Sequence, residues 1–389
     1  METNYNISYN DGAFVEILGN NNSTYEVNFF DKKTNRLIHS GFIKCNEWIR
    51  TSQKYYTEWY ITIKKDGEIV HTDLFNCTNK KVKIYLQSVA LGDNIAWIPY
   101  CDEFRKKHNC NLTIVTNVGL LFKESYPEIN FIKENIDGFY STYNVHVGIR
   151  KDIHNEGIEK LNKYFKKNIP IKFISDLSFY NSEYHPEHPM YIPLQKVASN
   201  ILGLEFKEIR PLFKGIPNER PIKEKYICIS EFASAEGMKE WNNKVGWKNL
   251  ISNLKSLGYK VISISKEKTK LDDVIKRNGD FPLSDRMWYL KHCEFFVGLG
   301  SGLSWLSWAC GAKTVMIGGF SEEWFEFQED NIRVINRDSC TGCFNSPKHA
   351  DKLCCYHVTL CPENKNFECS RKISPKMVLD KIRENELIK

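Results

Sequence analysis

Short runs of alternating apolar and polar residues fill the first part of the chain. Residues 24–30 (TYEVNFF) and 59–63 (WYITI) are rich in β-branched and aromatic side chains, and turn-forming residues at 31–35 and 65–68 separate runs of this kind. Alternation that is interrupted by such turns is typical of antiparallel hairpins. The pattern therefore predicts a small β domain over residues 1–80.

After residue 80 the pattern changes to continuous apolar runs that are followed by helical periodicity. Residues 82–86 predict a buried strand, 93–108 a helix and 112–116 the next strand, which is the order of the β-α-β units that build a parallel sheet. A second series of the same kind comprises a helix at 247–257 and strands at 226–230, 260–265, 295–298 and 314–317. We therefore predict an α/β fold with two Rossmann-like domains.

Two Rossmann-like domains that face each other form the GT-B arrangement of many glycosyltransferases, so the fold class suggests a chemistry by analogy. We expect a first, acceptor-side domain over residues 81–222 and a second domain, for a nucleotide-sugar donor, over residues 223–336. Residues 337–389 would form a metal finger and a C-terminal helix.

Length and composition exclude several classes of protein. The chain has 389 residues, 42% of them hydrophobic and 26% charged, which is average for a soluble protein of more than one domain. No apolar run reaches the roughly 20 residues that cross a bilayer, and the polar N-terminus shows no targeting pattern. We expect a cytoplasmic protein without a membrane partner. The net charge of +6 is dispersed, so it suits a nucleotide diphosphate or mere solubility and does not indicate nucleic-acid binding.

The first candidate for chemistry follows the strand at 82–86. The stretch 88–97 (SVALGDNIAW) places Asp93 where a strand gives way to a helix, and ligands of open α/β sheets bind beyond the carboxyl ends of the strands. A carboxylate at that position can act as a general base on an acceptor hydroxyl. The alternative is that Gly92 makes a tight turn and Asp93 caps a helix that begins at Asn94.

A glycine-rich turn at 298–305 (GLGSGLSW) is the second candidate, because it lies between an apolar strand and a helix predicted over 303–310. Glycines let the backbone approach a pyrophosphate, and a helix N-terminus supplies amide donors. The third glycine of a dinucleotide fingerprint is absent, which argues against an NAD site; a turn without a ligand is the alternative. The residues expected to contact the donor are Gly300, Ser301, Gly302, Leu303, Ser304 and Trp305.

The stretch 234–243 (SAEGMKEWNN) follows the strand at 226–230 and is the third candidate. Lys239 could reach the diphosphate and stabilise the charge that develops on this leaving group. The alternative is an ordinary solvated lysine.

Six of the thirteen cysteines lie within residues 340–369. The sequence CTGC at 340–343, with further cysteines downstream, is typical of a tetrahedral thiolate site for zinc or iron. A closed site of this kind is structural rather than catalytic, and free buried thiols are the alternative. The adjacent pair Cys354 and Cys355 is awkward for a single ion, although one of the two could replace a chosen ligand. The chosen ligands are Cys340, Cys343, Cys361 and Cys369.

Five stretches, which extend over nearly the whole chain, match one known family in order. They are ALGDNIAWIPY (90–100), PLQKVASNILGL (193–204), KEWNN (239–243), GSGLSW (300–305) and FECS (367–370). Together with the cysteine finger they make the chain resemble the bacterial autotransporter O-heptosyltransferases, a strand-loop-strand family. Members of that family transfer heptose from ADP-heptose to serine residues of adhesin passenger domains.

The resemblance implies a GT-B enzyme with an N-terminal β domain and an inverting mechanism. It implies that Asp93 is the catalytic base, that Lys239 lies at the donor diphosphate and that the four chosen cysteines hold one iron ion, with zinc as the alternative. It also implies a large ring-shaped homo-oligomer. Two features depart from the family: the extra pair Cys354 and Cys355, and Leu360 where an aromatic residue more often precedes Cys-Pro.

Two other functions stay open on the sequence alone. A glycosyltransferase of the same fold could use another nucleotide sugar and a polysaccharide or lipid-linked acceptor. A non-enzymatic zinc finger over residues 338–372 could bind nucleic acid or a partner, but its mixed charges and the absence of a helix carrying histidines argue against a groove reader.

Overall fold

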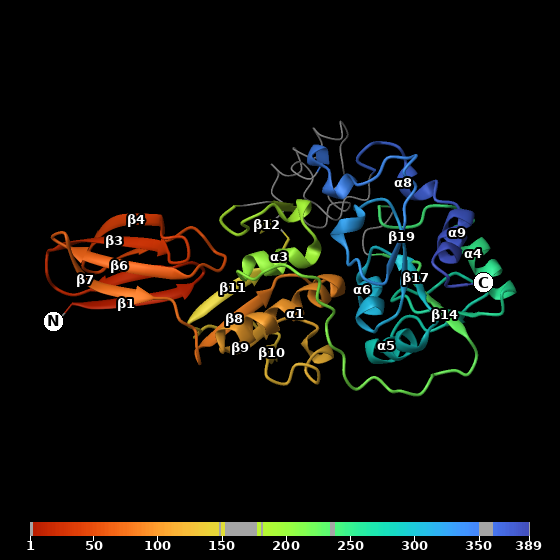
Figure 1. Cartoon of the computed structure of the whole chain (residues 1–389), viewed down its shortest axis with the longest axis horizontal. Coiled ribbons are helices and arrows are strands. Elements are labelled where there is room, and N and C mark those ends of the chain that lie inside the picture. Colours follow the sequence, from red (N-terminus) through yellow and green to blue (C-terminus); the bar gives the residue numbers. More distant parts are fainter. Residues whose placement is uncertain are drawn as a thin grey trace.

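The computed structural model describes residues 3–147, 149–151, 177–179, 182–233, 238–349 and 361–388. Residues 234–237, at the start of the Lys239 stretch, and the pair Cys354 and Cys355 lie outside these residues. The molecule is elongated, with the N-terminus at one end and the C-terminus at the other (Figure 1).

A four-stranded antiparallel sheet occupies the N-terminal end of the molecule, as the alternating pattern predicted. Its strands, in spatial order, are β4 (Arg36–Lys44), β3 (Thr24–Asp31), β6 (Trp59–Lys65) and β7 (Glu68–Leu74). Val27 and Phe29 on β3 pair with Ile63 and Ile61 on β6, and all four side chains are fully buried. One face of this sheet therefore forms an apolar core.

A seven-stranded mixed sheet joins the remaining N-terminal strands to the first predicted parallel series. Its strands, in spatial order, are β10 (Asn130–Ile132), β9 (Asn111–Val115), β8 (Lys81–Leu86), β11 (Ser141–Val145), β1 (Asn4–Asn10), β2 (Phe14–Leu18) and β5 (Glu47–Arg50). β1 runs parallel to β11, with Tyr9 opposite Ser141. Strand pairing therefore continues from the N-terminal strands into the first parallel series.

A six-stranded parallel sheet forms the other end of the molecule. Its strands, in spatial order, are β16 (Ile275–Lys276), β15 (Lys260–Ser263), β14 (Tyr226–Ile229), β17 (Phe296–Leu299), β18 (Thr314–Ile317) and β19 (Asn331–Val334). Every residue of β14, β17 and β18 is buried, as expected for parallel strands that are covered on both faces. Both predicted strand-and-helix series thus form parallel strands, the first of them within a mixed sheet.

Helices cover the sheets and connect their strands (Figure 1). The α-helices of the described residues are α1 (Leu91–His108), α3 (Leu194–Ile201), α4 (Gly246–Ser256), α5 (Leu283–His292), α6 (Gly302–Ala309), α8 (Glu368–Arg371) and α9 (Pro375–Glu384). Shorter elements are η1 (Gly119–Leu121), η3 (Pro189–Tyr191), η4 (Glu323–Phe325), η5 (Cys343–Asn345) and the antiparallel pair β12 (Ile149–Lys151) and β13 (Leu177–Phe179). In the described parts of the chain, no helix combines the length and the apolar character that a bilayer crossing requires.

The apolar core runs through the molecule rather than stopping at each sheet. We call residues 81–202 the first half and residues 226–334 the second half. One buried cluster includes Trp97 and Phe104 of α1 in the first half together with Trp305 and Trp308 of α6 in the second. The two halves therefore share a core where α1 and α6 meet.

Candidate functional site

The first half changes the direction of its strand order beside β8. The chain runs from β8 to β9 and β10 on one side and then returns to β11 on the other. Ligands of open α/β sheets bind at such a reversal, beyond the carboxyl ends of the strands. Asp93 follows β8, and His146 comes directly after β11. The N–H of Gln87 donates to the carbonyl of Val145 at 2.9 Å, which keeps the two strand ends side by side.

The second half reverses in the same way beside β14, with β15 and β16 on one side and β17 on the other. Glu231 follows β14, and the turn that contains Gly300 follows β17. The N–H of Ser230 donates to the carbonyl of Val297 at 3.0 Å. Each half therefore has a reversal of the type that binds ligands in α/β proteins.

Gly92 and Gly302 bring these two regions into contact. A Cβ atom on Gly92 would lie 3.4 Å from the Cα of Gly302 and 3.0 Å from Cδ1 of Trp305. A Cβ atom on Gly302 would lie 2.9 Å from the Cβ of Leu91 and 3.1 Å from the backbone nitrogen of Gly92. The N-termini of α1 and α6 thus touch backbone to backbone, so the first two candidates predicted from the sequence lie at one place.

The turn before α1 holds Asp93 in position. Ser88 Oγ donates to Asp93 Oδ2 at 2.5 Å and accepts the N–H of Ala90 at 3.1 Å. The buried amide of Asn94 donates to the carbonyls of Ser88 and Ala90 at 2.9 and 2.8 Å, and the hydroxyl of Thr116 donates to its oxygen at 2.6 Å. These bonds fix a half-buried carboxylate at the end of β8.

The alternative in which Asp93 caps the helix is wrong. α1 begins at Leu91, and its N-cap residue is Ala90, which makes no side-chain cap bond. Asp93 is the third residue of the helix, where the helix dipole favours a negative charge. Asp93 therefore lies within the first turn of α1 rather than ahead of the helix.

The glycine-rich turn offers hydrogen-bond donors to an anion. Ser301 is the N-cap of α6 and makes no side-chain cap bond, and its buried hydroxyl has no hydrogen-bond partner within the described residues. The hydroxyl of Ser304 donates to the carbonyl of Leu299 at 2.5 Å, so it stabilises the turn itself. The first amides of a helix, here those of Gly302 and Leu303, have no partner within the helix. This is the usual donor set for a phosphate.

Trp305 lies beneath this turn and is only 2% exposed. Its Nε1 donates to Glu326 Oε2 at 2.7 Å, and its ring packs edge-on against Trp308 and Phe327 with centroids 5.6 and 5.0 Å apart. A Cβ atom on Gly300 would lie 3.3 Å from Glu326 Oε1. Trp305 and Glu326 therefore support the turn from the core side.

The Lys239 stretch docks onto the C-terminal region of the chain. Lys239 is half-buried and lies two residues before Trp241. Trp241 Nε1 donates to the carbonyl of Ile373 at 2.8 Å, and Asn242 Nδ2 donates to Ser370 Oγ at 2.7 Å. Ser370 is the residue after Cys369, so the Lys239 stretch is hydrogen-bonded to the cysteine finger.

Gly319, which follows β18, is in contact with two separate parts of the cysteine finger. Gly342 adopts a left-handed conformation with φ 69° and donates its N–H to the carbonyl of Gly319 at 2.8 Å. A Cβ atom on Gly319 would lie 3.2 Å from Cγ2 of Thr341 and 3.2 Å from Cβ of Cys369. The CTGC turn and the helix that carries Cys369 therefore converge on one residue of the second half.

The cysteines predicted as metal ligands shift one another's pKa. Burial, followed by the charges of Cys369, Cys340 and Cys361, raises the pKa of Cys343 to about 12. Burial and the charges of Cys340 and Cys361 raise the pKa of Cys369 to about 12 as well. Cys343 and Cys369 therefore hold their protons strongly, and a bound cation would have to displace those protons.

The four cysteines have the chemistry of a thiolate metal site, but their side chains are not arranged as one. Among the described residues, no three His, Cys, Asp or Glu side chains are arranged to hold a metal ion. The N–H of Lys365 donates to Cys361 Sγ at 3.3 Å. Cys354 and Cys355, the other possible ligands, lie outside the described residues.

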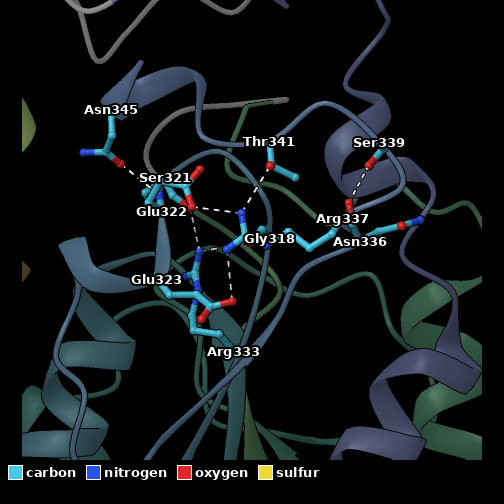
Figure 2. A network of polar contacts seen from close by, with 10 residues as sticks. All are labelled: Gly318, Ser321, Glu322, Glu323, Arg333, Asn336, Arg337, Ser339, Thr341 and Asn345. Carbon is cyan, nitrogen blue, oxygen red and sulfur yellow. Dashed lines mark hydrogen bonds and ion pairs between the residues drawn. The ribbon is translucent and has the colours of Figure 1, made fainter. Parts of the chain in front are cut away.

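Arg337 ties the CTGC turn to the loop after β18 (Figure 2). Its Nη1 donates to Glu322 Oε2 at 2.9 Å and to Thr341 Oγ1 at 3.3 Å, and its Nη2 donates to Glu323 Oε1 at 3.1 Å. The hydrogen bond to Glu322 is the main reason that the pKa of Arg337 is raised.

Asn345 extends this network to the first half. Its Oδ1 accepts the N–H of Glu322 at 2.8 Å, and its Nδ2 donates to the carbonyl of Met190 in η3 at 2.7 Å. Asn345 is buried, so both bonds are shielded from water. The finger is thus in contact with both halves of the molecule.

Two buried residues at the strand ends were missed by the sequence reasoning. His146 follows β11, and Glu231 follows β14. Glu231 Oε2 accepts from the hydroxyls of Ser263 and Ser265 at 2.9 and 2.7 Å, while Oε1 has no hydrogen-bond partner in the described parts of the chain. The available signal was a titratable residue within two positions of a strand end, but it becomes specific only once the strand order is known.

No family model matches the chain. It is 30% identical to the autotransporter heptosyltransferase BAHTCr of Citrobacter rodentium, over 94% of this chain and 85% of that protein. It is also 30% identical to the autotransporter heptosyltransferase Aah of Escherichia coli, over 92% and 88% of the two chains.

The fold is similar to that of TibC from enterotoxigenic E. coli, described as a bacterial iron-containing dodecameric glycosyltransferase. The match has a TM-score of 0.82 at 27% identity and covers 99% of this chain and 95% of TibC. A second TibC structure, in complex with ADP-D-β-D-heptose, matches equally well.

Each half contains parallel strands with a reversal of strand order, and the relatives show that the chain is a glycosyltransferase. The identity to the relatives extends over nearly the whole chain. The chain belongs to the autotransporter heptosyltransferase family.

Proposed function

We propose that this protein transfers heptose from ADP-heptose to serine residues of an autotransporter passenger domain, with inversion at the anomeric carbon. The observation that carries the proposal is the contact between Gly92 and Gly302. This contact brings the turn that carries Asp93 beside the glycine-rich turn of the second half, which supports the assignment of both to one site.

Asp93 acts as the general base in this proposal. Its carboxylate takes the proton of the serine hydroxyl while the serine oxygen attacks the anomeric carbon of heptose. The bond from that carbon to the β-phosphate oxygen breaks in the same step, and ADP leaves with the electron pair. Ser88 orients the carboxylate through its 2.5 Å hydrogen bond.

The leaving diphosphate would be stabilised by the N-terminus of α6. The amides of Gly302 and Leu303 lie at the end of the helix where its dipole favours an anion, and Ser301, the N-cap residue, would add a hydroxyl donor. Lys239 would add a positive charge from the neighbouring loop. Gly300 keeps the turn compact, and Ser304 and Trp305 support it from within.

The finger holds one iron ion in this proposal, with zinc as the alternative, and the ligands are Cys340, Cys343, Cys361 and Cys369. When bound, the ion would supply a tetrahedral cross-link between the CTGC turn and the helix that carries Cys369. The hydrogen bond between Asn242 and Ser370 would connect this cross-link to the Lys239 stretch.

The proposed organisation is that of a GT-B enzyme. Residues 1–80 form the N-terminal β domain, 81–222 the acceptor-side domain, 223–336 the donor domain and 337–389 the finger with its final helix. The protein is proposed to work in the cytoplasm as a homo-oligomer.

Asp93→Asn tests the base directly, because asparagine keeps the shape of the side chain but cannot accept the proton. We expect the rate of heptose transfer to a passenger fragment, followed by mass spectrometry, to fall by about 10²- to 10⁴-fold. ADP affinity, measured by calorimetry, should stay within a factor of about 3 of the unmodified protein's value, because the second half is untouched. Glu103→Gln, on the same helix, is the matched control. Near-normal transfer by Asp93→Asn would exclude Asp93 as the base.

A further inference from the structure

A short strap, residues 207–210, crosses the contact between the two halves. Its odd-numbered residues bind the first half. The hydroxyl of Tyr100 on α1 donates to the carbonyl of Lys207 at 2.5 Å. The side chain of Gln195 on α3 accepts the N–H of Ile209 at 3.1 Å and donates to the carbonyl of Ile209 at 2.7 Å.

The even-numbered residues of the strap bind the second half. The two carboxylate oxygens of Glu208 accept the backbone N–H groups of Gln328 and Glu329 at 2.6 and 2.8 Å. Arg210 Nη2 donates to Asp330 Oδ2 at 2.7 Å. Hydrogen bonds to an ionised group are about twice as strong as neutral ones, so this side of the strap is firmly held by the turn before β19.

A continuous set of aromatic contacts leads from the strap to the candidate site. The guanidinium of Arg210 lies over the ring of Trp308 at 5.4 Å. Trp308 packs edge-on against Trp305 at 5.6 Å, and Trp305 is the side chain that lies against Gly92. Packed side chains therefore connect the strap to the contact between α1 and α6.

We infer that the strap sets the alignment of the two halves, and that Glu208 and Arg210 are positioning residues for the transfer step. The inference rests on the proposed function, because it concerns the placement of Asp93 relative to the donor. Each half keeps its own ligand-binding edge without the strap, but the acceptor hydroxyl and the anomeric carbon must lie within about 3.5 Å to react. Alignment therefore acts on turnover rather than on donor binding.

Glu208→Ala and Arg210→Ala test this inference in the full-length protein with ADP-heptose and a passenger fragment. We expect kcat to fall roughly 10- to 100-fold, since a misplacement of about 1 Å has an effect of this size. ADP affinity, measured by calorimetry, should change by less than about 3-fold. The amides of Gln328 and Glu329 should exchange hydrogen faster in Glu208→Ala, because they lose the carboxylate that accepts their hydrogen bonds.

Glu208→Gln and Glu329→Ala complete the test. Glutamine retains a single carbonyl oxygen as acceptor, so Glu208→Gln should recover part of the lost kcat. The side chain of Glu329 is 66% exposed and its ion pair contributes little, so Glu329→Ala should have normal kcat and normal amide exchange.

Three results would overturn the inference: unchanged amide exchange in Glu208→Ala, faster exchange with unchanged kcat, or a loss of ADP affinity as large as the loss of kcat. Failure of the proposed function looks different, because the unmodified protein would then not transfer heptose from ADP-heptose at all. The exchange of the two amides still reports on the strap in that case.

Discussion

Gly92 and Gly302 are required for a close approach of two helices, and neither is required for a turn. Each would place a Cβ atom within 3.4 Å of the other's backbone, a distance that real side chains rarely tolerate. The sequence singled out both positions because each lies between a strand and a helix. It could not show that they touch, because their contact depends on how the two halves pack.

Gly92→Ala and Gly302→Ala should each destabilise the protein by about 1–3 kcal/mol, which is the usual effect of an extra methyl group in a packed contact. They should also reduce heptose transfer, because the added carbon separates α1 from α6. Denaturant unfolding and a transfer assay measure the two effects.

Gly19→Ala is the matched control for these substitutions. Its added carbon would lie 3.2 Å from the sulfur of Cys45 and 3.6 Å from the Cα of Thr3, far from the candidate site. Normal stability and normal transfer in Gly302→Ala would show that the helices do not need to approach so closely.

The cysteine finger illustrates, at the scale of an element, what can and cannot be predicted from the sequence. The CTGC spacing predicted a thiolate site because two ligands three positions apart fit one tetrahedral ion. The contacts of the finger with Gly319, Asn242 and Met190 were not predictable, because they join residues that lie far apart along the chain. Glu231 was missed for the same reason, because it follows β14 whereas Ser263, which donates to it, lies on β15.

The contact between the finger and the Lys239 stretch leads to a prediction. Ser370→Ala removes the hydroxyl that accepts from Asn242 Nδ2 at 2.7 Å and leaves all four proposed ligands in place. We expect this variant to keep its metal ion by elemental analysis but to bind ADP about 5- to 10-fold more weakly, the effect of one buried hydrogen bond. Cys369→Ala should lose both the ion and ADP affinity.

Ser339→Ala is the control for this experiment. Its hydroxyl donates to the carbonyl of Asn336 at 2.9 Å, within the finger's own loop (Figure 2), so ADP affinity should not change. If Ser370→Ala bound ADP normally, the finger would not act on the Lys239 stretch through this contact.

At the scale of the whole molecule, exposed apolar residues gather on the N-terminal strands. Phe42 on β4 is 73% exposed and Trp48 on β5 is 62% exposed, and these strands lie at the edges of their sheets. Exposed apolar edge strands are typical sites of association between chains. TibC, whose fold matches over 99% of this chain, is dodecameric, so we expect these strands to contribute to the proposed homo-oligomer.

Phe42→Glu should therefore give a smaller assembly than the unmodified protein, because a buried unpaired charge opposes association. Size-exclusion chromatography with light scattering measures the mass. Leu120→Glu is the matched control, because Leu120 is 79% exposed but lies in η1, away from the N-terminal strands. An unchanged mass for Phe42→Glu would place the contacts elsewhere.

The parallel pairing of β1 with β11 has a consequence for biosynthesis. Tyr9 leaves the ribosome long before its partner Ser141 is translated, so one edge of β1 stays unpaired while β2 to β10 emerge. Pairings of such long sequence separation form slowly, and an open strand edge can recruit another nascent chain. Production of this enzyme should therefore depend on chaperones that shield its N-terminus until residue 145 has been made.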